Sequence, residues 1–295
     1  MIHLITYCFR LFIYILLTLL EFIYYISIKK NMMNINKLKI KEYKNFLRVV
    51  DLKQKNLIFA KKFILKNKIT LIKNFALKNS FKDYIKLAKS FGKTLDYNNK
   101  PYYKFDESSQ QPISLHTDGV SCLNYKKIPN YILFYVDSWP KNKKGFFKVS
   151  STKKIIQMLP KKYVQILKNH KLQYLNYAGT HKRFVKINNE DEVTFKKFCL
   201  RKVNGHWTLD MFLPIKKMTK DVKWDYKMQF EGLSLKDSEK ILKNISKITD
   251  KKECKCEFPL SSKSLLIVNN ERFFHGRNKF SEKVKRSLYR IQVLN

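Results

Sequence analysis

Two short motifs contain residue types that bind transition metals. His116 and Asp118 stand two residues apart, and His275 follows far downstream, directly after an apolar segment. On a β-strand, side chains two positions apart point to the same face, so His116 and Asp118 can converge on one ion while Thr117 faces away. Each motif alone is weak, because His-x-Asp is a common tripeptide and a single histidine often serves only the core.

Together, these residue types indicate a particular chemistry. Two histidines and one carboxylate are the facial triad of non-haem iron(II) oxygenases. Such a triad leaves three coordination positions open, which suit a bidentate 2-oxo acid and dioxygen. The far carboxylate of 2-oxoglutarate then needs a fixed cation, and a guanidinium group binds a carboxylate through two parallel hydrogen bonds.

Arginine is scarce in this chain, so its positions are informative. Only eight arginines occur, and four of them lie in the last 24 residues. Arg286 and Arg290 share one face of a strand predicted over 286–294. Two arginines that point inward are costly without anionic partners, which favours an anion-binding cavity at this strand.

The order and spacing of these motifs resemble the taurine dioxygenase (TauD/TfdA-like) family. The stretch from Asn270 to Arg290 resembles the family's signature Asp-Asn-x-Arg-x-x-His-Gly-Arg, followed by Arg-x-Leu-x-Arg. Upstream, a helix predicted over 52–67, a short strand over 69–72 and a helix that Gly92 ends are similar to the family's N-terminal region. The resemblance covers nearly all of residues 50–295.

The resemblance implies a role for each matching position. His116, Asp118 and His275 would be the iron ligands. Arg286 would pair with the distal carboxylate of 2-oxoglutarate, and Arg290 would contact the cosubstrate or an anionic group of the substrate. Asn270 would shape the turn that leads into the distal histidine.

Some positions depart from the family's pattern. Lys148 stands where the family has a threonine that binds the cosubstrate, so Lys148 is the candidate for that role, as a point charge. Ser264 and Asn269 also replace the usual residues. The family's halogenases carry a small residue at the position of Asp118, so the carboxylate here favours hydroxylation or desaturation.

The implied fold is mainly β with flanking helices, built on a double-stranded β-helix (jelly-roll) core. The implied enzyme is an oxidoreductase that uses Fe(II), the cosubstrate 2-oxoglutarate and dioxygen, and that acts on a small molecule with an anionic group. The alternative is a catalytically inactive jelly-roll relative that binds a metal or a small anion, which the departure at Lys148 motivates.

Hydrophobic periodicity predicts the elements that must position these residues. Strands are predicted over 69–72, 129–136, 264–268 and 286–294. Helices are predicted over 52–67, 155–167 and 234–248, with another that Ser80 caps. Strands therefore carry the motifs while helices flank them, which favours a β-rich core over alternating βαβ units.

Amino-acid composition indicates which classes of binding partner to expect. The formal net charge is +38, but lysine greatly outnumbers arginine and is spread along the whole chain. That distribution is typical of solvated faces and compositional bias, so no specific nucleic-acid partner is expected. The five cysteines show no zinc spacing, which fits a reduced, cytoplasmic protein.

The N-terminal segment differs in character from the rest of the chain. Residues 11–28 form an apolar run followed by Lys29 and Lys30. This run is long enough for one membrane span, whereas Met32 and Met33 directly precede sequence of ordinary soluble character. We therefore divide the chain into segment 1–32, either a membrane anchor or a start-site artefact, and a dioxygenase domain over 33–295. The oligomeric state is left open.

Overall fold

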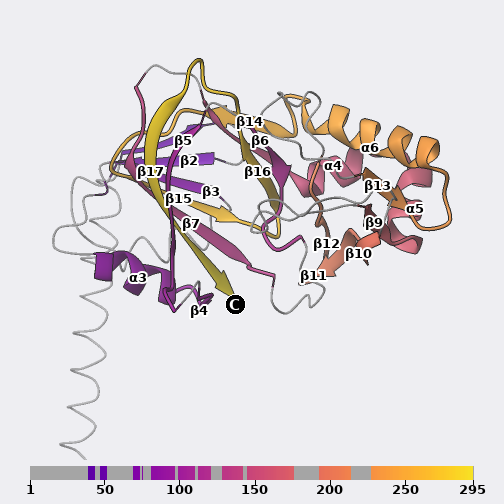
Figure 1. Cartoon of the computed structure of the whole chain (residues 1–295), viewed down its shortest axis with the longest axis horizontal. Helices are drawn as coiled ribbons and strands as arrows, with labels where there is room; N and C mark the ends of the chain where they lie inside the picture. The colour runs from indigo at the N-terminus through magenta and orange to yellow at the C-terminus, as the bar shows by residue number, and fades with distance from the viewer. Residues whose placement is uncertain are drawn as a thin grey trace, which may run out of the picture.

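A computed structural model describes residues 39–43, 47–51, 69–73, 75, 81–96, 99–109, 112–120, 128–141, 145–175, 193–213 and 227–294. Two β-sheets, antiparallel except at one pair of strands, form its centre, and Figure 1 shows a helical lobe to one side of them. This architecture confirms the predicted β-rich jelly roll with flanking helices. The proposed segment 1–32 and the helix predicted over 52–67 lie outside the described residues.

The larger sheet has eight strands in the order β1-β2-β3-β15-β7-β17-β4, and β5 also pairs with β17, along Val284–Arg290. Among the described strands, only β2 and β3 pair in parallel. The bounds are β1 Lys39–Tyr43, β2 Leu47–Asp51, β3 Ile69–Lys73, β4 Lys93–Thr94, β5 Tyr103–Ser109, β7 Tyr131–Ser138, β15 Ser264–Asn269 and β17 Val284–Leu294.

The smaller sheet has four strands in the order β14-β8-β16-β6. Its outer strand β6 and its neighbour β16 carry the two histidine motifs. The bounds are β6 Ile113–His116, β8 Phe147–Ser151, β14 Lys255–Phe258 and β16 Phe273–Arg277.

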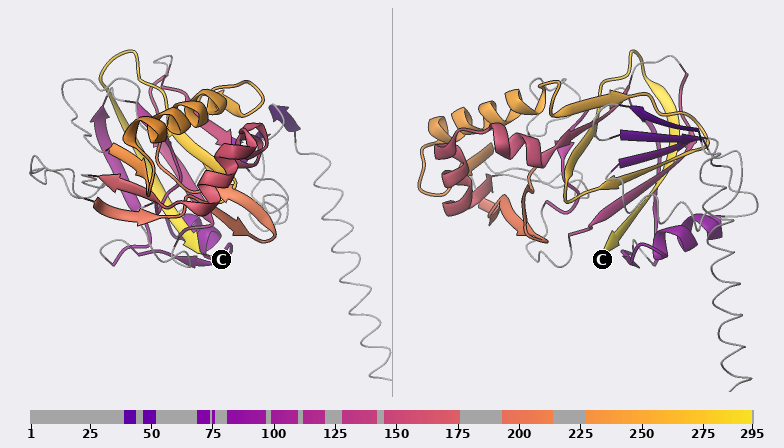
Figure 2. Two further views of the ribbon diagram at one scale, coloured as in Figure 1. Left: turned by 90° about the vertical axis from the view of Figure 1, so that its right-hand side faces the viewer. Right: turned by 180° about the vertical axis from the view of Figure 1, so that it is seen from behind.

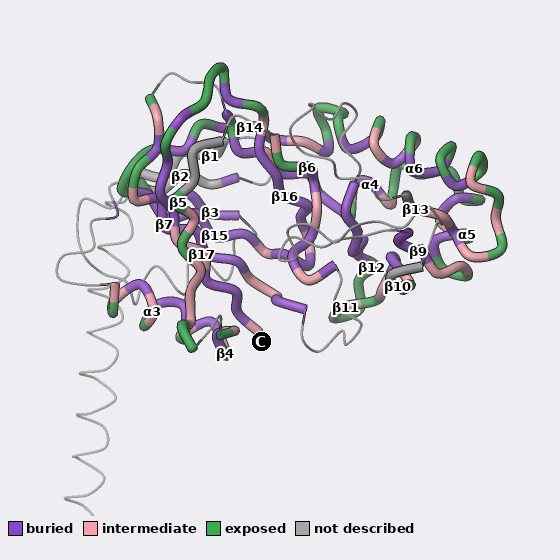
Figure 3. Tube along the Cα trace, viewed as in Figure 1, coloured by how far each residue is buried: buried purple, intermediate pink, exposed green. Residues whose placement is uncertain are grey.

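Central strands of the larger sheet are buried on both faces. Along β7, Ile132 and Phe134 pack into the core that fills the space between the sheets, whereas Leu133 and Tyr135 pack outward beneath helix α3 (Phe81–Lys89). Because successive strand residues point to opposite faces, such a strand is a continuous apolar run in the sequence. Figure 3 shows these central strands as almost wholly buried.

The helical lobe lies between the two motifs in the chain, and Figure 2 shows it from two further sides. Its core includes side chains from α4, α5, α6, β9, β13 and the 199–213 region, and it packs onto Leu115 and Phe274 beside the histidines. The bounds are α4 Thr152–Met158, α5 Lys161–Asn169, α6 Leu235–Thr249, β9 Leu172–Leu175, β10 Val193–Lys197, β11 Leu200–Val203, β12 His206–Leu209 and β13 Lys227–Phe230.

Most predicted elements within the described residues are present. The strands over 69–72, 264–268 and 286–294 are confirmed as β3, β15 and β17, and the strand over 129–136 begins two residues later as β7. The helix predicted over 234–248 is α6, whose N-terminal N–H of Asp237 bonds to Ser234 Oγ.

The single helix predicted over 155–167 was wrong. The chain forms two helices there, α4 and α5, which are separated at Leu159 and Pro160. Proline lacks a backbone N–H and disfavours helical backbone at the preceding residue, and Leu159 accordingly has extended dihedrals. The same ring suits the start of a helix, so α5 begins directly after Pro160.

No helix within the described part of the chain is long and apolar enough to cross a membrane.

Candidate active site

Adjacent strands bring the two histidine motifs together. In the antiparallel pair of β16 and β6, His275 lies directly opposite His116, and Asp118 follows two residues later in a turn. One ligand atom from each of these three residues lies within 4.8 Å of the other two. Residues far apart in the sequence thus present two imidazoles and a carboxylate in one place, as predicted.

The two oxygens of the Asp118 carboxylate have different neighbours. Oδ1 lies 3.3 Å from Nε2 of His116 and 3.6 Å from Nε2 of His275. Oδ2 accepts hydrogen bonds from Arg290 Nη1, at 3.0 Å, and from Gln292 Nε2. Oδ1 is therefore the oxygen that faces the space between the two imidazoles, while Arg290 and Gln292 of β17 hold Oδ2.

Electrostatics favours the charged form of Asp118. Burial by itself would raise the pKa of this carboxyl group. The Arg290 guanidinium and the hydrogen bonds with His116 and His275 outweigh burial and hold the pKa well below its ordinary value. A carboxylate that stays ionised is the form that coordinates a metal ion.

His275 is held in its neutral form. Burial, followed by the neighbouring His116, lowers the pKa of His275 to about 4. Its ring packs among aromatic side chains, 5.9 Å from the ring centre of Phe134 and parallel to Phe147 at 6.3 Å. Neutral imidazole is the metal-binding form of histidine, so the environment of His275 suits a ligand.

His116 is oriented by its own strand. Its Nδ1 lies 2.8 Å from the carbonyl oxygen of Ser114, and its ring stacks on Phe212 with 5.0 Å between ring centres. In the tautomer whose Nδ1–H donates to that carbonyl, the lone pair of Nε2 is available to a metal ion, whereas in the other tautomer Nε2–H donates to Asp118 Oδ1. Metal-ligating histidines characteristically donate their second ring N–H as in the first of these tautomers. The donor set fits a 2-His-1-carboxylate iron(II) site.

The side chain of Asn270 contacts the backbone of Asp118 rather than the turn before His275. Its Oδ1 accepts from the backbone N–H of Asp118 at 2.8 Å, and its Nδ2 donates to the carbonyls of Asp118 and Pro129 at 3.1 and 2.8 Å. The turn itself uses the preceding residue, because Asn269 Oδ1 accepts from the N–H of Glu271. The amide of Asn270 therefore fixes the backbone of Asp118 across 152 residues of chain.

The arginines of β17 lie where the alternation predicts. Arg286 and Arg290 share the face of Leu288, which packs into the core between the sheets. Arg286 is 4% exposed, and its guanidinium carbon lies 5.8 Å from the Trp139 ring and 5.9 Å from the Phe280 ring.

A further buried arginine lies nearby. Arg277 is 2% exposed and points to the same face of β16 as His275, two positions earlier. Its guanidinium carbon lies 4.2 Å from the centre of the Phe280 ring, which Arg286 also approaches. Sequence reasoning did not assign Arg277 to the site, although its place in the His-Gly-Arg motif was the available signal.

Lys148 is not brought to this site. It pairs with Gly276 in β16, so its side chain lies on the sheet face opposite the one shared by His275 and Val149. Burial lowers the pKa of Lys148, while Asp250 and Glu257 beyond that face partly oppose the shift. The register therefore argues against Lys148 as the replacement for the cosubstrate-binding threonine.

Known proteins share both the sequence pattern and the fold. Residues 51–292 match the family described as "Taurine catabolism dioxygenase TauD, TfdA family". The chain belongs to the TauD/TfdA family. It is therefore an Fe(II)- and 2-oxoglutarate-dependent dioxygenase. No curated protein matches the sequence.

Solved structures of similar fold agree with this TauD/TfdA membership. PvcB from Pseudomonas aeruginosa is 12% identical with a TM-score of 0.65, and the alignment covers 87% of this chain and 91% of PvcB. A taurine dioxygenase from Burkholderia xenovorans is 14% identical with a TM-score of 0.63, covering 88% and 91%. AAD-2, in complex with Mn(II) and N-oxalylglycine, is 10% identical with a TM-score of 0.61, covering 87% and 97%.

Proposed function

We propose that His116, Asp118 and His275 hold the iron(II) of this dioxygenase. The observation that carries this assignment is the convergence of their three ligand atoms within 4.8 Å, at a place where the pKa shifts favour a charged carboxylate and a neutral His275 imidazole. When bound, iron(II) with 2-oxoglutarate and dioxygen supplies the oxidising chemistry.

The cosubstrate's distal carboxylate is assigned to Arg286. Its guanidinium is buried on the face of β17 that turns toward the smaller sheet, and burial strengthens a charge-assisted pair with a carboxylate. The aromatic rings of Trp139 and Phe280 beside it limit access of water. Phe134, Phe147 and Phe212 do the same around the histidines.

The substrate is proposed to be a small molecule with an anionic group, which the enzyme hydroxylates or desaturates. Arg290 is the residue that supports this. It lies next to the metal-binding residues, with Nη1 3.0 Å from Asp118 Oδ2, so its positive charge lies where it attracts an anionic group of the substrate. Its ring contacts with Phe105 and Tyr103 keep the guanidinium plane in place.

Anaerobic absorption spectroscopy tests the metal and cosubstrate assignment. Addition of iron(II) and 2-oxoglutarate to the metal-free protein should produce a weak charge-transfer band. His275→Ala should lose this band, because it removes one imidazole ligand. His206→Ala is the matched control, since His206 is an exposed histidine in the hairpin of β11 and β12 and should leave the band unchanged.

Two outcomes would contradict the assignment. A folded native protein without the band would support a catalytically inactive relative instead. A band that persists in His275→Ala would place the metal elsewhere.

A separate experiment addresses the cosubstrate and substrate. Succinate release should be screened against amino acids, sulfonates and other small anions, with neutral analogues as comparison. Arg286→Ala should raise the KM for 2-oxoglutarate, whereas Lys285→Ala on the exposed face of β17 should not. Release that is stimulated equally by neutral analogues would refute the anionic substrate.

A further inference from the structure

A buried ion pair in the helical lobe lies close to the metal-binding residues. Asp210 follows β12 and is 1% exposed, and Lys197 at the end of β10 is 3% exposed. Lys197 Nζ lies 2.7 Å from Asp210 Oδ2, and Arg201 Nε approaches the same oxygen at 3.6 Å. Burying such charges is costly, so the arrangement calls for a reason beyond stability alone.

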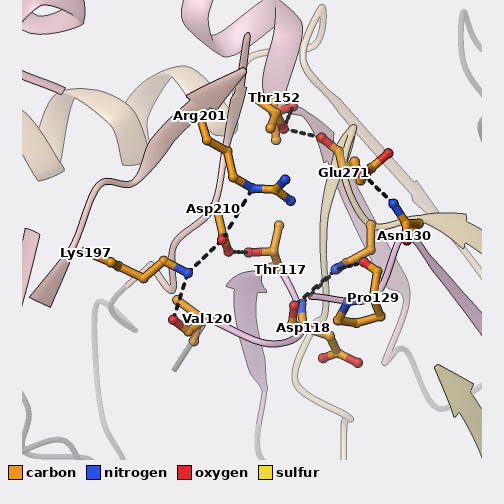
Figure 4. A network of polar contacts seen from close by, with 12 residues as sticks. Thr117, Asp118, Val120, Pro129, Asn130, Thr152, Lys197, Arg201, Asp210 and Glu271 are labelled. Atoms are coloured by element: carbon orange, nitrogen blue, oxygen red, sulfur yellow. Dashed lines mark hydrogen bonds and ion pairs between the residues drawn. The ribbon is translucent and has the colours of Figure 1, made fainter. Parts of the chain in front are cut away.

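Both members of the pair bind the loop that contains Asp118. Thr117 Oγ1 donates to Asp210 Oδ1 at 2.6 Å, and Lys197 Nζ donates to the carbonyl of Val120 at 3.1 Å. The lobe thus forms hydrogen bonds with Thr117, one residue before Asp118, and with Val120, two residues after it. Figure 4 shows the hydroxyl of Thr117 beside the carboxylate of Asp210, while the carboxylate of Asp118 points away from this network.

The backbone next to Asp210 supports the same loop. The N–H of Thr117 donates to the carbonyl of Met211, and the N–H of Leu213 donates to the carbonyl of Leu115. Phe212 forms a β-bridge with His116. Residues 211–213 therefore continue the smaller sheet beyond β6, and Asp210 lies at the start of this short strand-like segment.

The contacts of Thr117 affect the direction in which the side chains of His116 and Asp118 point. Because Thr117 stands between His116 and Asp118 and points to the opposite side, fixing its side chain fixes the rotation of the peptide units that aim both ligands. Asn270 holds the backbone of Asp118 from the other side. A purely structural ion pair would stabilise the lobe without touching this loop.

We propose that Asp210, with Lys197 as its counter-charge, is a positioning residue that aims His116 and Asp118 at the metal through Thr117. The inference rests on the proposed metal site. Loss of an outer contact that orients ligands typically weakens metal binding by roughly 10- to 100-fold.

Cobalt(II) binding by the metal-free full chain measures this role without turnover. Thr117→Val removes the hydroxyl at nearly constant shape and should raise the Kd for Co(II) by about tenfold or more, with an altered d–d spectrum. Thr117→Ser keeps the hydroxyl and should stay close to the native protein. Thr249→Val is the matched control, because Thr249 is equally buried at 2% exposed and its hydroxyl bonds only within α6, to the carbonyl of Ser246.

Asp210→Asn tests the charge directly. It leaves Lys197 buried beside a neutral amide and should weaken Co(II) binding at least as much as Thr117→Val. If this variant does not fold, the Thr117 pair decides alone. Native Co(II) affinity and spectrum in folded Thr117→Val, or equal weakening in Thr117→Ser and Thr249→Val, would overturn the proposal.

Failure of the metal site itself gives a different result. In that case the native protein binds Co(II) no better than His275→Ala does, and the positioning role falls with the site. If native binding depends on His275 but not on Thr117, only the positioning role is refuted.

Discussion

The two oxygens of the Asp118 carboxylate have different partners at the candidate site. Asp118 Oδ1 faces both imidazoles, and its Oδ2 is occupied by Arg290 and Gln292. A carboxylate bound in this way would coordinate a metal through a single oxygen. Arg290 and Gln292 of β17 would therefore affect a metal bound at the proposed site, although neither is a proposed ligand.

At this scale we expect Gln292→Met to weaken Mn(II) binding by about tenfold, because Oδ2 of Asp118 loses one of its two donors at similar side-chain volume. Titration calorimetry on the metal-free protein measures the change. Gln229→Met is the control, since the amide of Gln229 bonds within the lobe, to the carbonyl of Leu233. Equal affinities of Gln292→Met and the native protein would contradict this role.

Cys199 provides a prediction on pH. Burial, with a smaller effect from the carboxylate of Asp210, raises the pKa of its thiol to about 12. An unfolded chain loses this proton near pH 9. Between these values the folded state binds more protons, so this group makes the folded state less stable as the pH rises.

Between pH 8 and pH 10.5 we expect the native protein to lose about 2 kcal/mol more unfolding free energy than Cys199→Ala does. Urea unfolding of both proteins at the two pH values measures this difference. Parallel losses in the two proteins would show that the thiol titrates normally in the folded state.

Among the elements, the end of β17 depends on the turn after α3. Gly92 has a φ of +154°, and a Cβ built on it would lie 2.0 Å from the carbonyl oxygen of Leu294. Only glycine permits this approach, which leads into the pairing of β4 with β17. β17 carries the arginines of the candidate site and Gln292. The position of its C-terminal end therefore affects where these side chains lie.

Gly92→Ala should therefore lower the free energy of unfolding by about 2 kcal/mol or more, from backbone strain and from the displaced strand end. Gly205→Ala is the matched control. Gly205 also has a positive φ, +78°, but nothing lies within 4 Å of its added Cβ, so only the cost of about 1 kcal/mol for the backbone conformation is expected. Denaturant unfolding compares the two variants, and equal losses would refute the close-approach argument.

For the whole molecule, the candidate site joins the two sheets. Its residues come from β6, the turn after β6, and β16 in the smaller sheet, and from β17 in the larger one. An unfolded chain does not assemble them, so ligands bound there stabilise the folded state by mass action.

Mn(II) and N-oxalylglycine should both stabilise the folded protein and raise its Tm. At 100 times its Kd, each of the two ligands should add about 2.7 kcal/mol to the free energy of unfolding. Differential scanning calorimetry of the metal-free protein with and without the two ligands measures this. His275→Ala should show little of the shift. A native protein whose Tm does not respond would argue against a site between the sheets.

The sequence by itself determined which residues are candidates for the chemistry and to which face of a strand the arginines of β17 point. The alternation of β17 placed Arg286 and Arg290 on one face. The His-x-Asp spacing predicted the convergence of His116 and Asp118, although β6 ends at His116 and Asp118 lies in the turn after it. These features are local, because strand geometry repeats every two residues. Pro160 was also a local signal for the break between α4 and α5, and the prediction of one helix overlooked it.

Only the tertiary structure decided which groups hold those residues. Gln292 reaches Asp118 across 174 residues, and Thr117 reaches Asp210 across 93. The register of β8 with β16, rather than the family position of Lys148, decided that its amine points away from His275. Such contacts depend on how distant strands pair and how the lobe packs against them, and no local pattern in the sequence encodes that pairing.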